Sequence, residues 1–269
     1  MTIEQRLRRH RAMFAPPNGS PRFGLGRVPL MVAALVGVTL SSTAQAQGTP
    51  DSRVALDLSA GYQTIATSFS QTVTFEQYSE SGSLTSTYTV GRRPVVDAGL
   101  IVRVWRSVGV GISGSYFHDS GSAQVNALVP NPLVFGQPRH VNGPAGASHT
   151  EAGVHFQAAY WVQPSQRLEI VVSGGPSVFR VDQDFVSDVT YTQTFPYDVA
   201  TYQGASVIRQ RKTETGVNIG GEVGWRVARH LGLAAALRFS RATAEFPGTS
   251  AQSMVLGGLH VGGGIRLPF

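Results

Sequence analysis

Few residues of this 269-residue sequence combine into a pattern that could do chemistry. His118 and Ser120 stand two positions apart, a spacing that puts a base and a nucleophile on the same side of an extended strand. No carboxylate that could orient the histidine is evident on a neighbouring strand face, so we interpret the spacing as chance. His155 and His260 fall in different segments, too isolated to predict a metal site. We therefore expect no enzymatic activity, no cofactor and no metal.

The charged residues are more informative, because many recur on one side of an alternating pattern. Five arginines and six carboxylates share the parity of glycine and serine: Arg53, Asp57, Asp97, Arg103, Glu151, Glu169, Glu214, Glu222, Arg226, Arg238 and Arg266. Their charges nearly cancel, and unpaired charges are costly to bury. We expect an ion-pair network that plugs a narrow interior. The alternative is a narrow solute path, with Arg103, Arg226 and Arg266 forming an anion ring near its periplasmic end.

The elements that must position these residues show a period of two. Eight segments alternate apolar with polar or small residues: 53–65, 96–104, 108–116, 151–162, 168–178, 214–227, 231–240 and 255–269. Such alternation indicates β-strands with one apolar face, and no run of 18 apolar residues follows residue 46. The pattern predicts an all-β protein, an eight-stranded antiparallel up-and-down transmembrane β-barrel.

The length of the apolar face separates a membrane barrel from a soluble carrier, which also alternates. About five or six alternate apolar residues occur in each segment, matching the roughly 9 to 11 tilted residues that cross a bilayer. Aromatic residues lie near the ends of these rows, as residues of an interfacial girdle do: Tyr62, Tyr116, Tyr160, Trp225 and Phe269. These two features favour the membrane.

The connections alternate in length as well. Those at 106–107, 163–167 and 228–230 are short, whereas those at 66–92, 119–148 and 182–213 are long. Short periplasmic turns and long outer loops are typical of outer-membrane barrels. Residues 72–90 alternate around a glycine turn at Gly82, which predicts a hairpin beyond the membrane.

The third long connection also has the composition of a protruding hairpin. Arg209, Arg211 and Lys212 form a basic cluster near its return, which lipopolysaccharide phosphates could contact. If this connection instead supplied two spanning strands, the barrel would have ten.

The beginning of the chain predicts export. The apolar run Val28–Leu40 follows six arginines and precedes Ala44-Gln-Ala46, the order of a secretory signal peptide cleaved after Ala46. We expect residues 1–46 to be this peptide and 47–269 to be the barrel domain. Without residues 1–46 the 22 basic and 16 acidic side chains become 16 and 15, a net charge of +1, which weakens any nucleic-acid interpretation.

Together the leader, the eight alternating segments, the short turns and the final Leu267-Pro268-Phe269 resemble the small bacterial outer-membrane β-barrel family, whose members are similar to the barrel of outer-membrane protein A. The resemblance implies outer-membrane lipid and lipopolysaccharide as surroundings. It also implies that Ile265, Leu267 and Phe269 form the signal read by the barrel-assembly machinery. Pro268 departs from the usual pattern and predicts that strand pairing ends before it.

The resemblance is one of architecture and leaves the role open. We expect a non-enzymatic protein with an envelope-structural or surface-interaction role, whose surface ligand is unknown. The main alternative is a narrow solute channel or a side-opening transporter of small hydrophobic molecules. A lesser one is a lipid A deacylase, since small barrels with that activity use a histidine and a serine spaced like His118 and Ser120.

Overall fold

The computed structural model describes residues 53–246 and 253–269. The predicted signal peptide lies outside the described residues. The strands in the described part are β1 (Val54–Gln63), β2 (Thr67–Gln77), β3 (Glu80–Val90), β4 (Pro94–Trp105), β5 (Val108–Val129), β6 (Arg139–Val162), β7 (Leu168–Gln193), β8 (Ala200–Ala228), β9 (Leu231–Glu245) and β10 (Ser253–Pro268). No helix in this part is long and apolar enough to cross a membrane.

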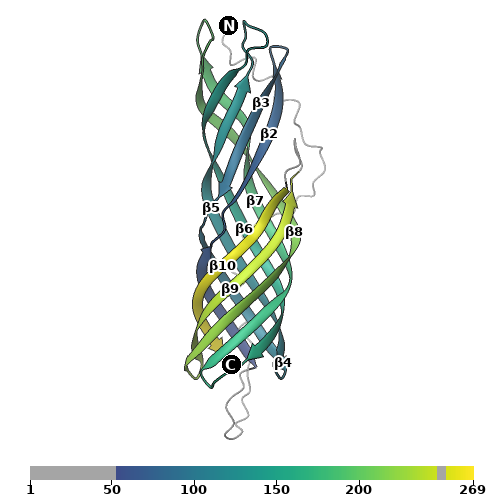
Figure 1. Cartoon of the computed structure of the whole chain (residues 1–269), viewed down its shortest axis with the longest axis vertical. Helices are drawn as coiled ribbons and strands as arrows, with labels where there is room; N and C mark the ends of the chain where they lie inside the picture. The colour runs from purple at the N-terminus through teal and green to yellow at the C-terminus, as the bar shows by residue number, and fades with distance from the viewer. Residues whose placement is uncertain (1–52, 247–252) are drawn as a thin grey trace, which may run out of the picture. The chain divides into compact units, whose positions relative to one another are not determined.

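Eight of the described strands close into a ring (Figure 1). β1 pairs with β4 and β10, and the order continues from β10 through β9, β8, β7 and β6. β5 pairs with both β4 and β6 and so completes the circle. These pairings are antiparallel. Because the ring is closed, the backbone N–H and C=O groups of its strands find hydrogen-bond partners within the protein. A bilayer requires this, since hydrocarbon offers no such partners. The predicted eight-stranded barrel is confirmed.

A belt of exposed apolar side chains surrounds the ring. On β5 it runs from Val108 through Val110 and Ile112 to Tyr116, while the inward-facing residues between them are glycine or serine, at positions 109, 111, 113 and 115. Exposing this much apolar surface to water would cost free energy, whereas contact of the same surface with lipid is favourable. The belt therefore faces the hydrocarbon of a membrane.

The inward glycines leave room for larger side chains opposite. Gly109 shows this most clearly, because a Cβ atom there would lie 2.6 Å from the ring of Trp161. The alternation of large outward and small inward residues thus sets which face of each strand can turn toward the narrow interior.

The second and third long connections are largely strands. This corrects the expectation of a loop at 119–148, whereas 182–213 forms the protruding hairpin for which it has the composition. β5 continues to Val129, β6 begins at Arg139, and β7 and β8 extend to Gln193 and from Ala200. From Ala123 onward the inward residues of β5 are alanine and valine, and the outward residues Gln124 and Asn126 are polar. That reversed pattern belongs to a water-exposed sheet with an apolar core, so these strands continue past the lipid as an extension.

The predicted hairpin of the first connection is present as β2 and β3, although its turn is not at Gly82. The turn lies at Tyr78 and Ser79, which both have positive φ, of 54° and 59°. Gly82 lies within β3, packed against the ring of Phe75. β3 pairs with the outer half of β5, from Ser83↔Leu128 to Tyr88↔Ala123. Thus the two strands beyond the eight of the ring come from the first connection, not the third.

The extension has two layers. One is the sheet β2-β3-β5-β6, and the other is the outer part of the β7–β8 hairpin. Leu84, Tyr88 and Val125 from the first layer and Phe185 and Val186 from the second form a shared buried core. The Tyr88 hydroxyl joins the layers by accepting a hydrogen bond from the Val186 N–H at 2.7 Å. The extension is therefore packed like a small soluble domain.

Strand pairing continues past Pro268, contrary to expectation. Phe269 N donates to Val54 O at 2.8 Å, and Val54 N donates to Phe269 O at 3.3 Å. Because N–H directions alternate along a strand, the nitrogen of Pro268 faces the β9 side, where pairing has already ended at Gly232. The proline therefore removes no ladder hydrogen bond.

Candidate functional site in the barrel interior

The most crowded polar cluster in the interior surrounds Arg266 of β10. Its guanidinium lies 3.6 Å from Asp57 Oδ1 of β1, 3.2 Å from Glu169 Oε1 of β7, and donates a hydrogen bond to Glu222 Oε1 of β8. The arginine side chain is only 4% exposed. One guanidinium thus holds three carboxylates from three other strands, and the cluster carries a formal charge of −2.

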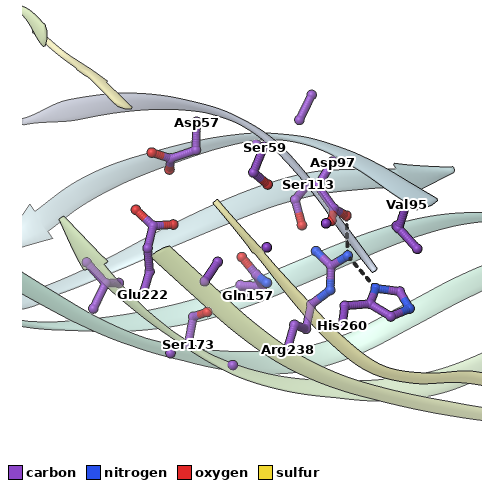
Figure 2. A pocket seen from close by; sticks show the side chains of 18 of the residues that line it. Asp57, Ser59, Val95, Asp97, Ser113, Gln157, Ser173, Glu222, Arg238 and His260 are labelled. Carbon is purple, nitrogen blue, oxygen red and sulfur yellow. Dashed lines mark hydrogen bonds and ion pairs between the residues drawn. The ribbon is translucent and has the colours of Figure 1, made fainter. Parts of the chain in front are cut away.

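A second cluster lies farther along the interior and joins β4, β9 and β10. Arg238 donates to Asp97 Oδ1 and also contacts His260 Nδ1 at 3.3 Å. Figure 2 shows the Arg238 guanidinium between these two side chains. The ion pair is formally neutral, so it cannot balance the excess negative charge around Arg266.

His155, which the sequence placed on the inward face, is fully buried next to this cluster. Its Nε2 lies 2.9 Å from Ser115 Oγ and its Nδ1 lies 2.8 Å from Ser177 Oγ. Asn218 donates to the same Ser177 oxygen at 2.9 Å. Both ring nitrogens are therefore occupied. Nowhere in residues 53–246 and 253–269 do three His, Cys, Asp or Glu side chains gather as a metal site would require.

A small cavity separates the two charged clusters. Its volume is about 80 Å³, and its lining includes Asp57, Asp97, Gln157, Glu222 and Arg238. In Figure 2 the carboxylates of Asp57 and Glu222 point toward one another across it. The space suits a few water molecules hydrogen-bonded to polar groups.

Apolar side chains border the polar interior as well. Ile101, Trp161 and Val171 form one buried cluster, in which Ile101 and Val171 line the cavity itself. Toward the extension, buried Phe179 and Met254 belong to another, which packs with Phe246. The interior is therefore covered by apolar side chains toward the extension, whereas at the other end Glu169 and Arg266 line a second small pocket.

A third polar cluster lies where the barrel meets the extension, and the sequence analysis missed its histidine. His149 Nε2 is 2.7 Å from Glu151 Oε1, and its Nδ1 is 2.7 Å from Gln183 Oε1. Glu151 Oε2 accepts a hydrogen bond from Gly257 N at 2.9 Å, which ties β6 to β10. The inward parity of His149, shared with Glu151, was the available signal, but the strand segment was expected to begin only at 151, directly after the loop expected at 119–148.

Several predicted members of the ion-pair network lie elsewhere. Arg53 is exposed just before β1, and Glu214 pairs with Lys212 at 2.9 Å near the outer end of the ring. Arg103 places its guanidinium 5.2 Å from the centre of the Trp161 ring. Arg226 is half-buried beside a small periplasmic pocket. The predicted single network is thus several separate clusters, because eleven inward positions spread along the whole barrel axis.

This placement also argues against an anion ring. Arg266 is committed to three carboxylates, and Arg103 lies over an indole. Arg226 lines the same small pocket as Arg266, but Glu169 lies there as well, so the three arginines do not form a purely cationic constriction.

The aromatic residues predicted as a girdle all lie on the outer surface. Tyr62 and Tyr116 are exposed at the end of the belt near the extension, while Tyr160, Trp225 and Phe269 are exposed at the other end. In the predicted assembly signal, Ile265 and Phe269 are exposed, and Leu267 lies half-buried in the same outward row.

The predicted His118–Ser120 pair lies on the outer face of β5. His118 Nδ1 is 2.8 Å from the hydroxyl oxygen of Thr150, and this exposed contact involves no carboxylate. Both residues are exposed, just beyond the lipid belt. The histidine thus interacts with a neutral group instead of the acidic partner that would orient a catalytic base.

The basic cluster at the return of the third connection is paired with acids. Arg209 Nε lies 2.8 Å from Asp184 Oδ1, and Arg211 Nε lies 2.6 Å from Asp182 Oδ1. The hydrogen bond from Arg209 lowers the pKa of Asp184 to about 2, and further bonds from Ser148 act in the same direction. These arginines are therefore neutralised by the neighbouring strand, which the sequence did not reveal.

No protein-family model and no curated protein match the chain. Solved structures do match it. Neisserial surface protein A is 12% identical, with a TM-score of 0.39 over 80% of this chain and 96% of its own. Outer membrane protein OprG from Pseudomonas aeruginosa is 10% identical, with a TM-score of 0.43 over 80% of this chain and 95% of its own. Outer membrane protease OmpT from Escherichia coli is 8% identical, with a TM-score of 0.43 over 85% of this chain and 100% of its own.

At these identities the likeness concerns the fold and not what any of these proteins binds or does. The closed antiparallel ring and the apolar belt around it make this chain a transmembrane β-barrel.

Proposed function

We propose that the protein is a non-enzymatic outer-membrane barrel with a closed interior, acting in envelope structure or surface interaction through its extension. The observation that carries the proposal is a chamber that lies between two charged clusters and is covered toward the extension by the apolar cluster of Phe179 and Met254. Arg266 and its carboxylates fill the cross-section on one side of that chamber, and Arg238 with Asp97 fills the other.

A closed interior leaves the extension as the part that can meet other molecules. Its strands continue well past the lipid belt, and its own apolar core keeps their geometry fixed. Barrels that conduct hold a continuous aqueous lumen, whereas here buried apolar side chains interrupt the polar interior. A rigid, outward-projecting structure supports a role at the cell surface.

Conductance across a planar lipid bilayer tests the closed interior. We expect the wild-type barrel to insert without steady discrete openings, while a porin in the same lipid serves as the positive control. Reproducible openings of the wild type would instead support the alternative of a narrow solute channel.

Analysis of lipid A by mass spectrometry tests the non-enzymatic part. We expect cells with and without the protein to show the same acyl-chain pattern, because His118 interacts with a threonine hydroxyl. A missing acyl chain that returns in the Ser120→Ala variant would establish deacylation and contradict the proposal.

The proposal also covers how the protein is exported and which molecules surround it in the membrane. We infer that residues 1–46 direct export and are cleaved after Ala46, which sequencing of the mature amino terminus would test. We also infer recognition of Ile265, Leu267 and Phe269 by the barrel-assembly machinery. Arg180 and Arg241 are exposed just beyond the lipid belt, which supports contact with lipopolysaccharide phosphates.

A further inference from the structure

The end of the ring that carries the short turns is rich in arginine. The turns between β4 and β5, between β6 and β7 and between β8 and β9 lie there, with the beginning of β1 and the end of β10 (Figure 1). Seven arginines and three carboxylates, a net charge of +4, fall in segments 53–57, 101–110, 157–171, 222–236 and 264–269. The remaining described residues carry nine basic and eleven acidic side chains, a net charge of −2. Positive charge is therefore concentrated at the turn end.

Four of these arginines form no ion pair within the described residues. Arg106, Arg167 and Arg229 are exposed, one in each short turn, and Arg226 is half-buried beside them. The three carboxylates at this end face the interior, where Arg266 holds them. We call Arg106, Arg167, Arg226 and Arg229 the arginine rim. Its charges are available to a ligand from outside the chain.

Exposed apolar side chains of the lipid belt lie directly beside the arginine rim. Trp105 is 67% exposed, and the guanidinium carbon of Arg106 lies 5.3 Å from the centre of a Trp105 ring. Trp225 and Val227, on either side of Arg226 in the chain, are 50% and 60% exposed. Tryptophan is enriched where the hydrocarbon of a bilayer meets the headgroups. The arginine rim therefore lies at the depth of the lipid phosphates.

Two members of the arginine rim meet at a small pocket between the β6–β7 and β8–β9 turns. Arg226 N donates a hydrogen bond to Arg167 O at 2.8 Å, which fixes the two residues side by side. Both line the pocket together with Trp225, Arg266 and Glu169, and Glu169 lies 3.2 Å from Arg266. Three arginines against one carboxylate give this lining a net charge of +2. Guanidinium groups bind phosphate oxygens through charge-assisted hydrogen bonds, so the pocket suits a phosphate group.

The position of the arginine rim indicates phospholipid as its occupant. Its members occur in all three turns, as the lipids surrounding a barrel do, and adjoin side chains that acyl chains cover. A phospholipid that packs against Trp105 or Trp225 brings its phosphate within reach of Arg106 or Arg226. The excess of positive charge then favours lipids with a net negative headgroup over zwitterionic ones, roughly fivefold for each arginine near the surface.

We propose that the arginine rim binds anionic phospholipids in the leaflet that surrounds the turn end. The phosphates contact Arg106 and the adjacent Arg167 and Arg226, and the acyl chains cover Trp105 and Trp225. The inference goes beyond the proposed role at the cell surface. It does not depend on the closed interior, so conductance and lipid preference can fail separately.

Quenching of tryptophan fluorescence by brominated lipid tests the proposal at the arginine rim itself. The chain has three tryptophans, of which Trp105 and Trp225 are exposed beside the rim and Trp161 is buried. The wild-type barrel is reconstituted in phosphatidylcholine vesicles that contain the same mole fraction of brominated phosphatidylglycerol or of brominated phosphatidylcholine. We expect brominated phosphatidylglycerol to associate about threefold to fivefold more strongly at low salt, and the preference to shrink as ionic strength rises.

Two pairs of substitutions with equal changes in charge give the matched comparison. Arg106→Gln with Arg226→Gln keeps both reporter tryptophans and should lower the preference for phosphatidylglycerol at least twofold. Arg92→Gln with Arg211→Gln removes the same charge from exposed positions beyond the other edge of the belt, and should leave the preference unchanged. Unaltered migration shifts on gels after boiling would show that the variants fold.

Three results would overturn the proposal. Equal quenching of the wild type by the two brominated lipids would leave an acidic soluble protein as the partner of the arginine rim. A preference that persists in Arg106→Gln with Arg226→Gln would place the lipid elsewhere. An equal loss in Arg92→Gln with Arg211→Gln would mean that overall charge attracts the lipid and the rim does not.

Discussion

Replacing Arg266 by methionine would remove the guanidinium shared by Asp57, Glu169 and Glu222. Methionine keeps much of the volume but leaves three carboxylates in a buried polar chamber. Breaking a buried ion pair by deleting one partner costs about 3 to 5 kcal/mol, because the remaining charge loses its compensation. We expect the free energy of unfolding to fall by about that amount.

Neutralising a carboxylate should have a much smaller effect, because the cluster has acid in excess. Glu222 accepts a direct hydrogen bond from Arg266, so Glu222→Gln should cost on the order of 1 kcal/mol. Asp57 lies at the longest distance, 3.6 Å, and contributes repulsion toward the other two carboxylates. We expect Asp57→Asn to change stability by less than about 0.5 kcal/mol, and to restore part of the loss when combined with Arg266→Met.

Reversible urea unfolding in lipid vesicles, followed by tryptophan fluorescence, measures these differences. Trp105 and Trp225 are exposed at the surface and Trp161 is buried, so the emission reports loss of the barrel. If Asp57→Asn were as destabilising as Arg266→Met, the explanation that one guanidinium compensates an excess of three carboxylates would be wrong.

Two other predictions concern pH and backbone geometry. The pKa of Asp184 is lowered to about 2 from an ordinary value of 3.8. The ionised carboxylate therefore stabilises the folded state, by about 1 kcal/mol once solvent screening at the exposed Arg209 is allowed for. This stabilisation is present above pH 4 and is lost as the pH falls toward 2. Hydrogen exchange of the outer β7–β8 hairpin should therefore accelerate over that range, and Asp184→Asn should reduce the dependence to the part contributed by Asp182, whose pKa the hydrogen bond from Arg211 also lowers. Gly257→Ala should destabilise the barrel by about 2 kcal/mol or more, because Gly257 has a φ of 79° and a Cβ there would lie 2.5 Å from Ser240 O. Gly146→Ala, with nothing within 4 Å, is the control, and equal unfolding midpoints of the two variants would contradict this explanation.

The sequence by itself determined the barrel. Alternation such as Val108, Val110, Ile112 and Tyr116 against glycine and serine depends only on local residue order. Because side chains point to opposite faces of a strand, that order fixes which row meets lipid before any partner strand is known. The inward positions of Asp57, Glu222 and Arg266 followed in the same way.

Partners across the interior were decided only by the tertiary structure. Parity places Arg266 inside, but strand closure determines that it meets Asp57, Glu169 and Glu222, which are far apart in the sequence. Likewise, Arg209 appeared to belong to a free basic cluster until register placed Asp184 beside it.

The extension shows most clearly the difference between what the local sequence determines and what only tertiary contacts decide. Residues 123–127 alternate, yet they lie between two membrane segments, where a loop is the ordinary expectation. Whether they pair depends on β3 and on the β7–β8 hairpin covering Ala123 and Val125. A strand outside lipid is stable only when distant strands bury its apolar face, and local sequence does not contain that contact.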